Sequence, residues 1–313
     1  MAWLEITVKT ASAGVEAAAA ALTAGGFADL VIEDQAQFED FLEQNRACWD
    51  YIDEELQQQL QGLSQIRLYL EDTDTGGLSR LTRLTEKLGL PMDVTAMPEV
   101  DWEESWKDNY PAVEVGRHLV VLPYWLAREE HGGRLPVILD PGLTFGTGAH
   151  PSTQMVMEAM ESLVTENSSC LDLGSGSGIL SIAALRLGAK SAVGVDIDPK
   201  AEDIARENAA YNGFTDPKFT ALTGNVTTDR PLMDKLGEKR YDIVLVNIVA
   251  DVVIGLAPVL PGFLTDSSTL ICSGILDTRL DAVTAAVEKA GLTVTAVYQK
   301  EDWRCITAKR RAL

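Results

Sequence analysis

From Pro136 onward, short apolar runs alternate with helix-forming segments, and this alternation restricts the fold more than any other feature of the sequence. The apolar runs are residues 137–139, 170–173, 192–195, 219–222, 243–246, 270–272, 294–298 and 305–307. Helices are expected between them, for example at 179–187 and 201–211. The pattern predicts an α/β domain with an open, doubly wound parallel sheet covered by helices on both faces. In such sheets, ligands bind beyond the carboxyl ends of the strands, at the point where the strand order reverses.

Residues 1–98 follow a different pattern and are predicted to form a separate, smaller α+β domain. Strands are expected at 4–8, 30–32, 66–70 and 92–97, and helices at 15–24, at 78–88 and in a polar region at 38–61. Without that polar region the order is β-α-β-β-α-β, the ferredoxin-like arrangement. Residues 99–135 are expected to connect the two domains and to contain a hairpin at 113–121, which leaves 136–313 for the larger domain.

A glycine-rich segment, residues 172–178 (Asp-Leu-Gly-Ser-Gly-Ser-Gly), lies between an expected strand and an expected helix. Alternate glycines allow the chain to turn sharply and to approach a ligand without a Cβ in the way. Asp196 ends the next strand, 18 residues after Gly178, where a carboxylate can accept both hydroxyls of a ribose. Asp198 has a simpler interpretation, because Asp-Pro is typical of a helix start with Asp as its N-cap.

Two cofactor classes use a glycine-rich turn of this kind. The dinucleotide fingerprint G-x-G-x-x-G requires a third glycine where this chain has Ile179, so a nicotinamide-dependent oxidoreductase is the weaker alternative. The acidic-x-Gly-x-Gly-x-Gly form, led by Asp172, resembles the first motif of Rossmann-like class I methyltransferases. The cofactor of those enzymes, S-adenosylmethionine, carries an ammonium group and no phosphate, and Asp172 is a suitable partner for that charge.

Residues 140–153 form a second segment rich in glycine and small polar residues, and they enter a helix near Pro151. Free N–H groups and hydroxyls at a helix start suit an anion such as the methionine carboxylate. A purely structural connector is the alternative interpretation.

Asn247 ends an apolar strand, a position from which its side chain can reach a ligand. If the substrate is an amine, the amide oxygen of Asn247 can accept a hydrogen bond from it and so direct the lone pair of the amine nitrogen. Asparagine is no general base, so this role is one of positioning. A helix cap is the structural alternative for Asn247. Trp303 is interpreted either as part of an apolar wall that dehydrates the amine or as core packing.

The segments 140–153, 171–198 and 246–251 together resemble the ribosomal protein L11 methyltransferase family. Residues 101–107, 273–276 and 301–303 extend the resemblance, which is close from about residue 100 onward and is limited to the layout in the first ninety. The resemblance implies an N-terminal domain that grips the substrate protein and a C-terminal domain that performs the chemistry. It also implies the cofactor-binding residues, which are Thr153, Gly174, Asp196 and Asn247, together with Asp172, Gly176, and Phe145 and His150 from a loop that closes on the methionine part. Asn247 is in addition the expected catalytic residue.

The function that the resemblance implies is S-adenosylmethionine-dependent N-methylation of lysine ε-amino groups and of the N-terminal α-amino group of ribosomal protein L11. The alternatives are a methyltransferase of another protein or of a small molecule, and a non-catalytic binding protein that acts in ribosome assembly. The net charge of −21 favours a basic partner over nucleic acid, although the charge is also compatible with a role in solubility alone.

Composition sets further expectations. The four cysteines, Cys48, Cys170, Cys272 and Cys305, form neither a metal-binding pair nor an evident disulfide framework. No apolar run approaches the roughly 20 residues of a membrane-spanning helix. We therefore expect a cytoplasmic monomer that binds neither a metal nor a membrane.

Overall fold

The computed structural model describes residues 3–27, 29–34, 64–97, 110–128, 130–141 and 147–311. Contacts between Cα atoms divide the chain into two compact units, Met1–Asp108 and Asn109–Leu313. Residues 110–135, which were expected to be a connector, therefore lie within the second unit. In the described part of the chain, no helix has both the length and the apolar character needed to cross a membrane.

The first unit has the expected ferredoxin-like topology. Its elements are β1 (Trp3–Lys9), a short 3-10 turn η1 (Ser12–Gly14), α1 (Val15–Ala24), β2 (Val31–Asp34), β3 (Ser64–Glu71), α4 (Thr75–Leu88) and β4 (Met92–Met97). The strands form one antiparallel sheet in the order β2-β3-β1-β4. The polar helical region expected at 38–61 lies outside the described residues.

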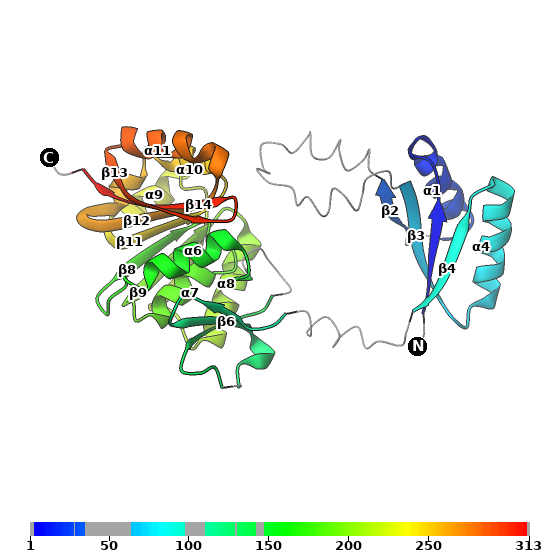
Figure 1. Cartoon of the computed structure of the whole chain (residues 1–313), viewed down its shortest axis with the longest axis horizontal. Helices are drawn as coiled ribbons and strands as arrows, with labels where there is room; N and C mark the ends of the chain where they lie inside the picture. Colours follow the sequence, from blue (N-terminus) through cyan, green and yellow to red (C-terminus); the bar gives the residue numbers. More distant parts are fainter. Residues whose placement is uncertain are drawn as a thin grey trace. The chain divides into compact units, whose positions relative to one another are not determined.

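Strand alternation gives this sheet two different faces. Helices α1 and α4 lie on the same side of it (Figure 1) and bury residues such as Ile6 and Leu68 against Leu22 and Leu81. Helix α4 ends where expected, because Gly89 adopts the left-handed conformation with φ 68°. The opposite face carries the alternate residues of each strand.

The second unit begins with a small sheet of three strands. Its elements are β5 (Val113–Val115), β6 (Leu119–Pro123), the 3-10 turn η3 (Tyr124–Leu126) and β7 (Leu135–Leu139). The β5–β6 hairpin is the expected one.

Strand β7 contains the run 137–139, which was expected to be the first strand of the large sheet, and that expectation is wrong because β7 pairs with β6 instead. The Asn212 side chain accepts from the N–H of Ile138 (3.0 Å) and donates to its carbonyl (2.7 Å). A side chain thus occupies the edge of β7 that a further strand would need.

The large sheet has seven strands in the order β10-β9-β8-β11-β12-β14-β13. Its strands are β8 (Ser169–Leu173), β9 (Ser191–Asp196), β10 (Phe219–Thr223), β11 (Tyr241–Asn247), β12 (Leu264–Leu276), β13 (Leu292–Lys300) and β14 (Trp303–Arg310). The first five are parallel, whereas β14 runs antiparallel to both β12 and β13. The order reverses between β8 and β11, so the carboxyl ends of β8, β9 and β11 are where a ligand is expected.

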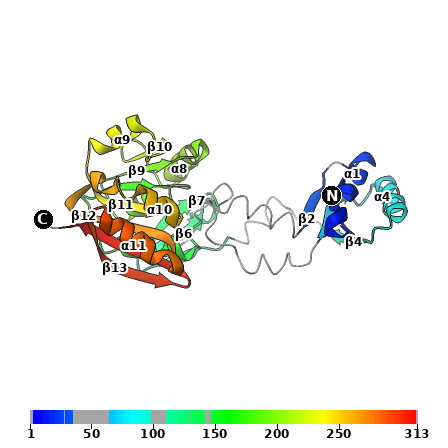
Figure 2. The ribbon, with the colours of Figure 1, turned by 90° about the horizontal axis from the view of Figure 1, so that it is seen from above.

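Helices cover both faces of the large sheet, and the C-terminal ones lie on the near face in Figure 2. One layer consists of α6 (Pro151–Met160), α7 (Ile179–Arg186) and α8 (Pro199–Tyr211), which are labelled in Figure 1. The other consists of α9 (Arg230–Gly237), α10 (Ala250–Leu256) and α11 (Leu280–Lys289), with the 3-10 turns η4 (Leu260–Phe263) and η5 (Asp277–Arg279) flanking β12. Successive side chains of the buried strands point alternately to the two helix layers and pack against them. Leu171 and Leu173 pack on the second, whereas Cys170 packs on the first.

Candidate active site

The glycine-rich turn after β8 needs its glycines for both conformation and space. Gly174, Gly176 and Gly178 have φ values of 78°, 49° and 78°, in the left-handed region that favours glycine. A Cβ on Gly174 would lie 2.4 Å from Cγ2 of Ile248, and one on Gly178 would lie 3.0 Å from Cβ of Ala205. The turn is therefore fitted closely to the loop after β11 and to α8.

Asp196, at the end of β9, is held by the same turn. Its Oδ2 accepts from the N–H of Gly176 at 2.8 Å, and its Oδ1 accepts from the N–H of Asp198 at 3.0 Å. An ionised carboxylate offers about four acceptor sites, so lone pairs remain for hydroxyl groups of a ligand. Asp198 accepts from the N–H of Lys200 at 2.9 Å and Pro199 begins α8, which confirms Asp198 as the N-cap.

Asp172, the penultimate residue of β8, is a fully buried carboxylate. Its Oδ2 accepts from both the N–H (3.1 Å) and the hydroxyl (2.9 Å) of Ser181. Burial raises the pKa of Asp172 to about 7, the Ser181 hydrogen bonds oppose that rise, and the charge of Asp196 adds to it. Its Oδ1 is buried and has no hydrogen-bond partner in the described part of the chain. A hydrogen-bond donor supplied by a ligand, such as an ammonium group, would satisfy the Oδ1 acceptor of Asp172.

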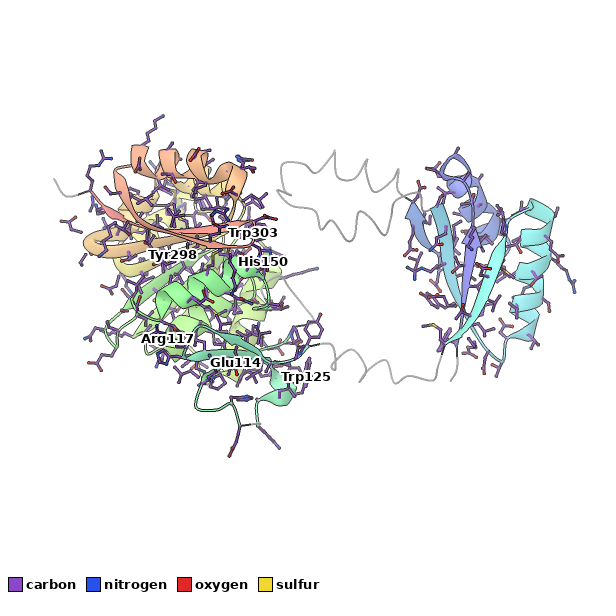
Figure 3. The ribbon with its side chains drawn as sticks, viewed as in Figure 1. Glu114, Arg117, Trp125, His150, Tyr298 and Trp303 are labelled. Atoms are coloured by element: carbon purple, nitrogen blue, oxygen red, sulfur yellow. The ribbon has the colours of Figure 1, made fainter. Side chains whose placement is uncertain are left out.

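His150 caps the start of α6. Its Nδ1 accepts from the N–H of Ser152 at 3.2 Å, and its ring meets the Trp303 ring edge to face with centroids 4.6 Å apart (Figure 3). Burial lowers the pKa of His150, although the charge of Glu301 acts in the opposite direction. An Nδ1 that accepts a hydrogen bond belongs to the neutral imidazole, and the lowered pKa favours that form.

Asn247 is the last residue of β11, and its side chain points to the first turn of α6. Its Nδ2 donates to the hydroxyl of Thr153 at 3.1 Å, and Thr153 is buried. This hydrogen bond fixes one end of the amide and leaves the oxygen end to accept from another group. The interpretation of Asn247 as a helix cap is wrong, because Val249 is the N-cap of α10.

Three residues of the site were not singled out from the sequence. Ile248 fills the space beside Gly174, and Ser181 holds Asp172. Asn208, buried on α8, donates to the carbonyl of Ser177 (2.9 Å) and accepts from the N–H of Asp140 (2.9 Å). The available signal was a polar residue on the apolar side of a predicted helix, as at Ser181 and Asn208.

The structure thus brings the predicted site residues to one edge of the large sheet. Asp172, Gly174, Gly176 and Asp196 gather at the ends of β8 and β9, and His150, Thr153 and Asn247 gather at the end of β11 and the start of α6. The contact of Gly174 with Ile248, the neighbour of Asn247, joins the two groups. Phe145 and the segment 101–107 lie outside the described residues. Within the described ranges, no group of three or more His, Cys, Asp or Glu side chains is placed to hold a metal ion.

A seven-stranded sheet of this order, with the glycine-rich turn after β8 and an acidic residue at the end of β9, defines a Rossmann-like class I methyltransferase. The family model for "Ribosomal protein L11 methyltransferase (PrmA)" matches residues 2–311. The chain belongs to the ribosomal protein L11 methyltransferase family.

Relatives of that name share the full length of the chain. The protein of Alkaliphilus metalliredigens is 36% identical over 320 residues, covering 99% of this chain and 98% of the relative. That of Pelotomaculum thermopropionicum is 36% identical over 319 residues and covers 100% of both. The crystal structure of ribosomal protein L11 methylase from Lactobacillus delbrueckii subsp. bulgaricus matches 65% of this chain and 100% of its own, with a TM-score of 0.59 and 29% identity.

Enzymes of this family depend on S-adenosylmethionine, and the residues present fit that cofactor. The turn at 174–178 gives a ligand close access to the backbone, and a Cβ at Gly174 would remove the space beside it. Asp196 retains acceptor sites suited to ribose hydroxyls, and Oδ1 of Asp172, which has no partner among the described residues, suits a cationic donor. When bound, the cofactor supplies a methyl group that the sulfonium charge already activates.

Proposed function

We propose that this enzyme N-methylates ribosomal protein L11, on the ε-amino groups of lysines and on the N-terminal α-amino group. Family membership over nearly the whole chain supports the substrate. The observation that carries the chemistry is the Asn247 amide, whose nitrogen end is held by Thr153 beside the glycine-rich turn and whose oxygen end accepts no hydrogen bond from the described residues.

The proposed cofactor site divides between the two groups of residues. Asp196 would accept the ribose hydroxyls, the backbone of Gly174 and Gly176 would line the cofactor, and Asp172 would act on its ammonium group. His150 and Thr153, with Phe145 and Asn247, would hold the methionine part.

Methyl transfer to an amine requires an uncharged nitrogen aligned with the methyl group. An α-amino group has a pKa of about 8 and a lysine side chain about 10.4, so the lysine needs more help to lose its proton. Burial against an apolar wall lowers both values. We infer that Trp303, half-buried beside His150, forms part of that wall.

Asn247 would then accept one N–H of the neutral amine and aim its lone pair. Because asparagine takes up no proton, its contribution is alignment, which can account for large rate effects. The proton of the lysine leaves to solvent as the amine is being enclosed.

The first unit is proposed to hold the substrate protein. Residues 1–108 contain 22 acidic and 7 basic side chains, so this third of the chain carries a net charge of −15 out of −21. A ribosomal protein that binds RNA is basic, and opposite charge steers such a partner to this unit. The sheet face away from α1 and α4 also exposes two aromatic residues, Trp3 (37% exposed) and Tyr69 (40%).

The test is intact-mass spectrometry of ribosomal protein L11 after incubation with the enzyme and S-adenosylmethionine. We expect a mass gain in whole methyl groups, and peptide mapping should place them on lysines and on the N-terminus. No gain on L11, with a gain on another protein or a small molecule, would reject the proposed substrate. Calorimetry that finds nicotinamide dinucleotide binding and no S-adenosylmethionine binding would reject the reaction itself.

A further inference from the structure

The first turn of α6 is held by residues that lie far along the chain. Thr153 accepts from Asn247, 94 positions later, and the carbonyl of Ser152 accepts from the Ser273 hydroxyl at 3.0 Å, 121 positions later. His150 packs on Trp303. The fourth contact comes from Lys300, at the end of β13, and has no assigned role.

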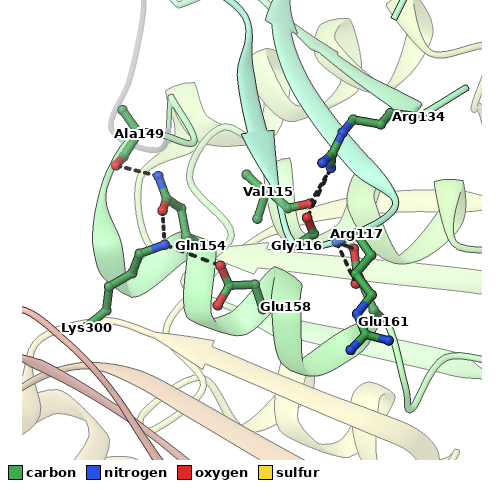
Figure 4. Close-up of polar contacts among 9 residues, drawn as sticks. All are labelled: Val115, Gly116, Arg117, Arg134, Ala149, Gln154, Glu158, Glu161 and Lys300. Atoms are coloured by element: carbon green, nitrogen blue, oxygen red, sulfur yellow. Dashed lines mark hydrogen bonds and ion pairs between the residues drawn. The ribbon is translucent and has the colours of Figure 1, made fainter. Parts of the chain in front are cut away.

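Lys300 reaches the turn through Gln154 (Figure 4). Its Nζ donates to Oε1 of Gln154, and Nε2 of Gln154 donates to the carbonyl of Ala149 at 2.9 Å. Both ends of the Gln154 amide are therefore used. Because the ammonium group can only donate, Lys300 determines that the oxygen of Gln154 faces β13 and that its nitrogen faces Ala149.

Ala149 lies in a short stretch that is fixed at each successive residue. Gly148 has φ 86°, and a Cβ there would lie 2.8 Å from Cγ1 of Val121 on β6. His150 is fixed by Ser152 and Trp303. The chain of hydrogen bonds from Lys300 fixes the residue between them and so determines where His150 starts the helix.

The exposure of these side chains indicates what kind of effect to expect. Lys300 also lies 3.3 Å from Glu158, but the two side chains are 37% and 41% exposed, and ion pairs this accessible to water contribute little to stability. The hydrogen bonds to Gln154 and Ala149 instead restrict a segment next to the proposed cofactor site. Restricting a binding segment in advance raises affinity, because less order has to be gained on binding.

We propose that Lys300 is a positioning residue of the cofactor site, acting through Gln154 on Ala149 so that His150 and Thr153 are in place before S-adenosylmethionine binds. This inference rests on the proposed cofactor-binding role of those two residues. Lys300, which lies outside the glycine-rich motifs at the end of β13, thereby becomes part of the binding machinery.

The first test is Lys300→Met, which keeps the length of the side chain and removes its charge. We expect the Kd of S-adenosylmethionine, measured by calorimetry, to rise roughly three- to tenfold. The kcat at saturating cofactor should stay within about twofold, because Asn247 still holds Thr153. In the cofactor-free protein, amide hydrogen exchange should become faster at residues 150 and 152–154. Lys300→Arg should restore the wild-type Kd, and Lys309→Met, an exposed lysine on β14, is the matched control.

A double-mutant cycle tests the route. Gln154→Ala should raise the Kd about as much as Lys300→Met, and the two together should be no worse than either alone. Glu158→Gln should leave the Kd unchanged. The inference is overturned if Lys300→Met lowers only the melting temperature, if the two effects simply add, or if Glu158→Gln weakens binding equally. Failure of the proposed function looks different, since the wild-type enzyme would then fail to bind the cofactor or to methylate L11.

Discussion

The two units of the molecule use their polar residues in opposite ways. In the second unit, Asp172, Thr153 and Asn208 are buried and bonded to partners from other elements. In the first unit, charged and aromatic residues share an open sheet face, where Tyr69 donates to Glu5 and Arg67 bridges Glu5 and Glu33. Aligning a reacting amine requires fixed geometry, whereas attracting a charged partner requires an accessible field.

The distribution of charge supports the same division. The second unit has 25 acidic and 19 basic residues, a net charge of −6 over 205 residues, against −15 over the first 108. The acidity of the chain is thus mainly a property of the unit proposed to bind the substrate. The chemistry and the recognition should therefore be separable by substitution.

Asn247→Ala is expected to have the largest effect. Removing the amide leaves the amine without an acceptor that aims it, and kcat should fall by on the order of 100-fold. The KM for ribosomal protein L11 should change little, because the first unit is intact. Single-turnover methyl transfer measures the rate. A variant that transfers methyl groups at the wild-type rate would remove Asn247 from the mechanism.

Asp172→Asn should change how stability depends on pH. The folded protein keeps the Asp172 proton up to a pKa of about 7, whereas the unfolded chain releases it near a pKa of about 3.9. The free energy of unfolding of the wild type should therefore fall between these values as the pH rises, by up to about 1.4 kcal/mol per pH unit relative to Asp172→Asn.

Urea unfolding of both cofactor-free proteins across that pH range provides the measurement. Leu88→Ala, which removes no ionisable group, serves as the control and should differ from the wild type by the same amount at every pH. A constant difference between wild type and Asp172→Asn at all pH values would contradict the raised pKa.

The double variant Trp3→Ala/Tyr69→Ala should affect recognition alone. Exposed aromatic residues are the side chains that most often dominate protein interfaces, so the KM for ribosomal protein L11 should rise by about tenfold. Both kcat and the Kd of S-adenosylmethionine should be unchanged. Leu88→Ala, on the helical side of the same unit, is the control for loss of an exposed apolar side chain. If Trp3→Ala/Tyr69→Ala and Leu88→Ala had equal KM values for ribosomal protein L11, the proposal that the open sheet face of the first unit binds the substrate would be contradicted.

Asp198→Ala should produce the smallest effect. Losing the N-cap of α8 should cost about 1 kcal/mol of stability, while the cofactor Kd stays the same because the backbone N–H that binds Asp196 remains. Asp196→Ala, two residues away, should weaken cofactor binding strongly. Thermal unfolding and calorimetry on both variants distinguish the helix-capping role of Asp198 from the cofactor-binding role of Asp196. A loss of binding in Asp198→Ala comparable to that in Asp196→Ala would contradict these two roles.

Sequence reasoning was most successful where the information is local. The strands, the left-handed end of α4 at Gly89 and the cap at Asp198 follow from patterns a few residues long, and the ferredoxin-like order follows from their sequence. The sheet to which 137–139 belongs could not be predicted, because an apolar run does not specify its partner strand. The contacts of Asn247 with Thr153 and of Lys300 with Gln154 were equally out of reach, since folding alone brings residues so far apart into hydrogen-bond distance.

The contacts that hold residues 150–154 come from residues 247–303, and this also affects when the cofactor site can form during synthesis of the protein. A chain is made from its N-terminus, and domains generally fold in that order. The ferredoxin-like unit can fold before residues 247–303, which hold the first turn of α6, have been synthesised. We therefore expect the nascent enzyme to remain unable to bind its cofactor tightly until the segment that contains residues 247–303 has been synthesised and has folded. The substrate-binding unit would then be complete before the cofactor site is.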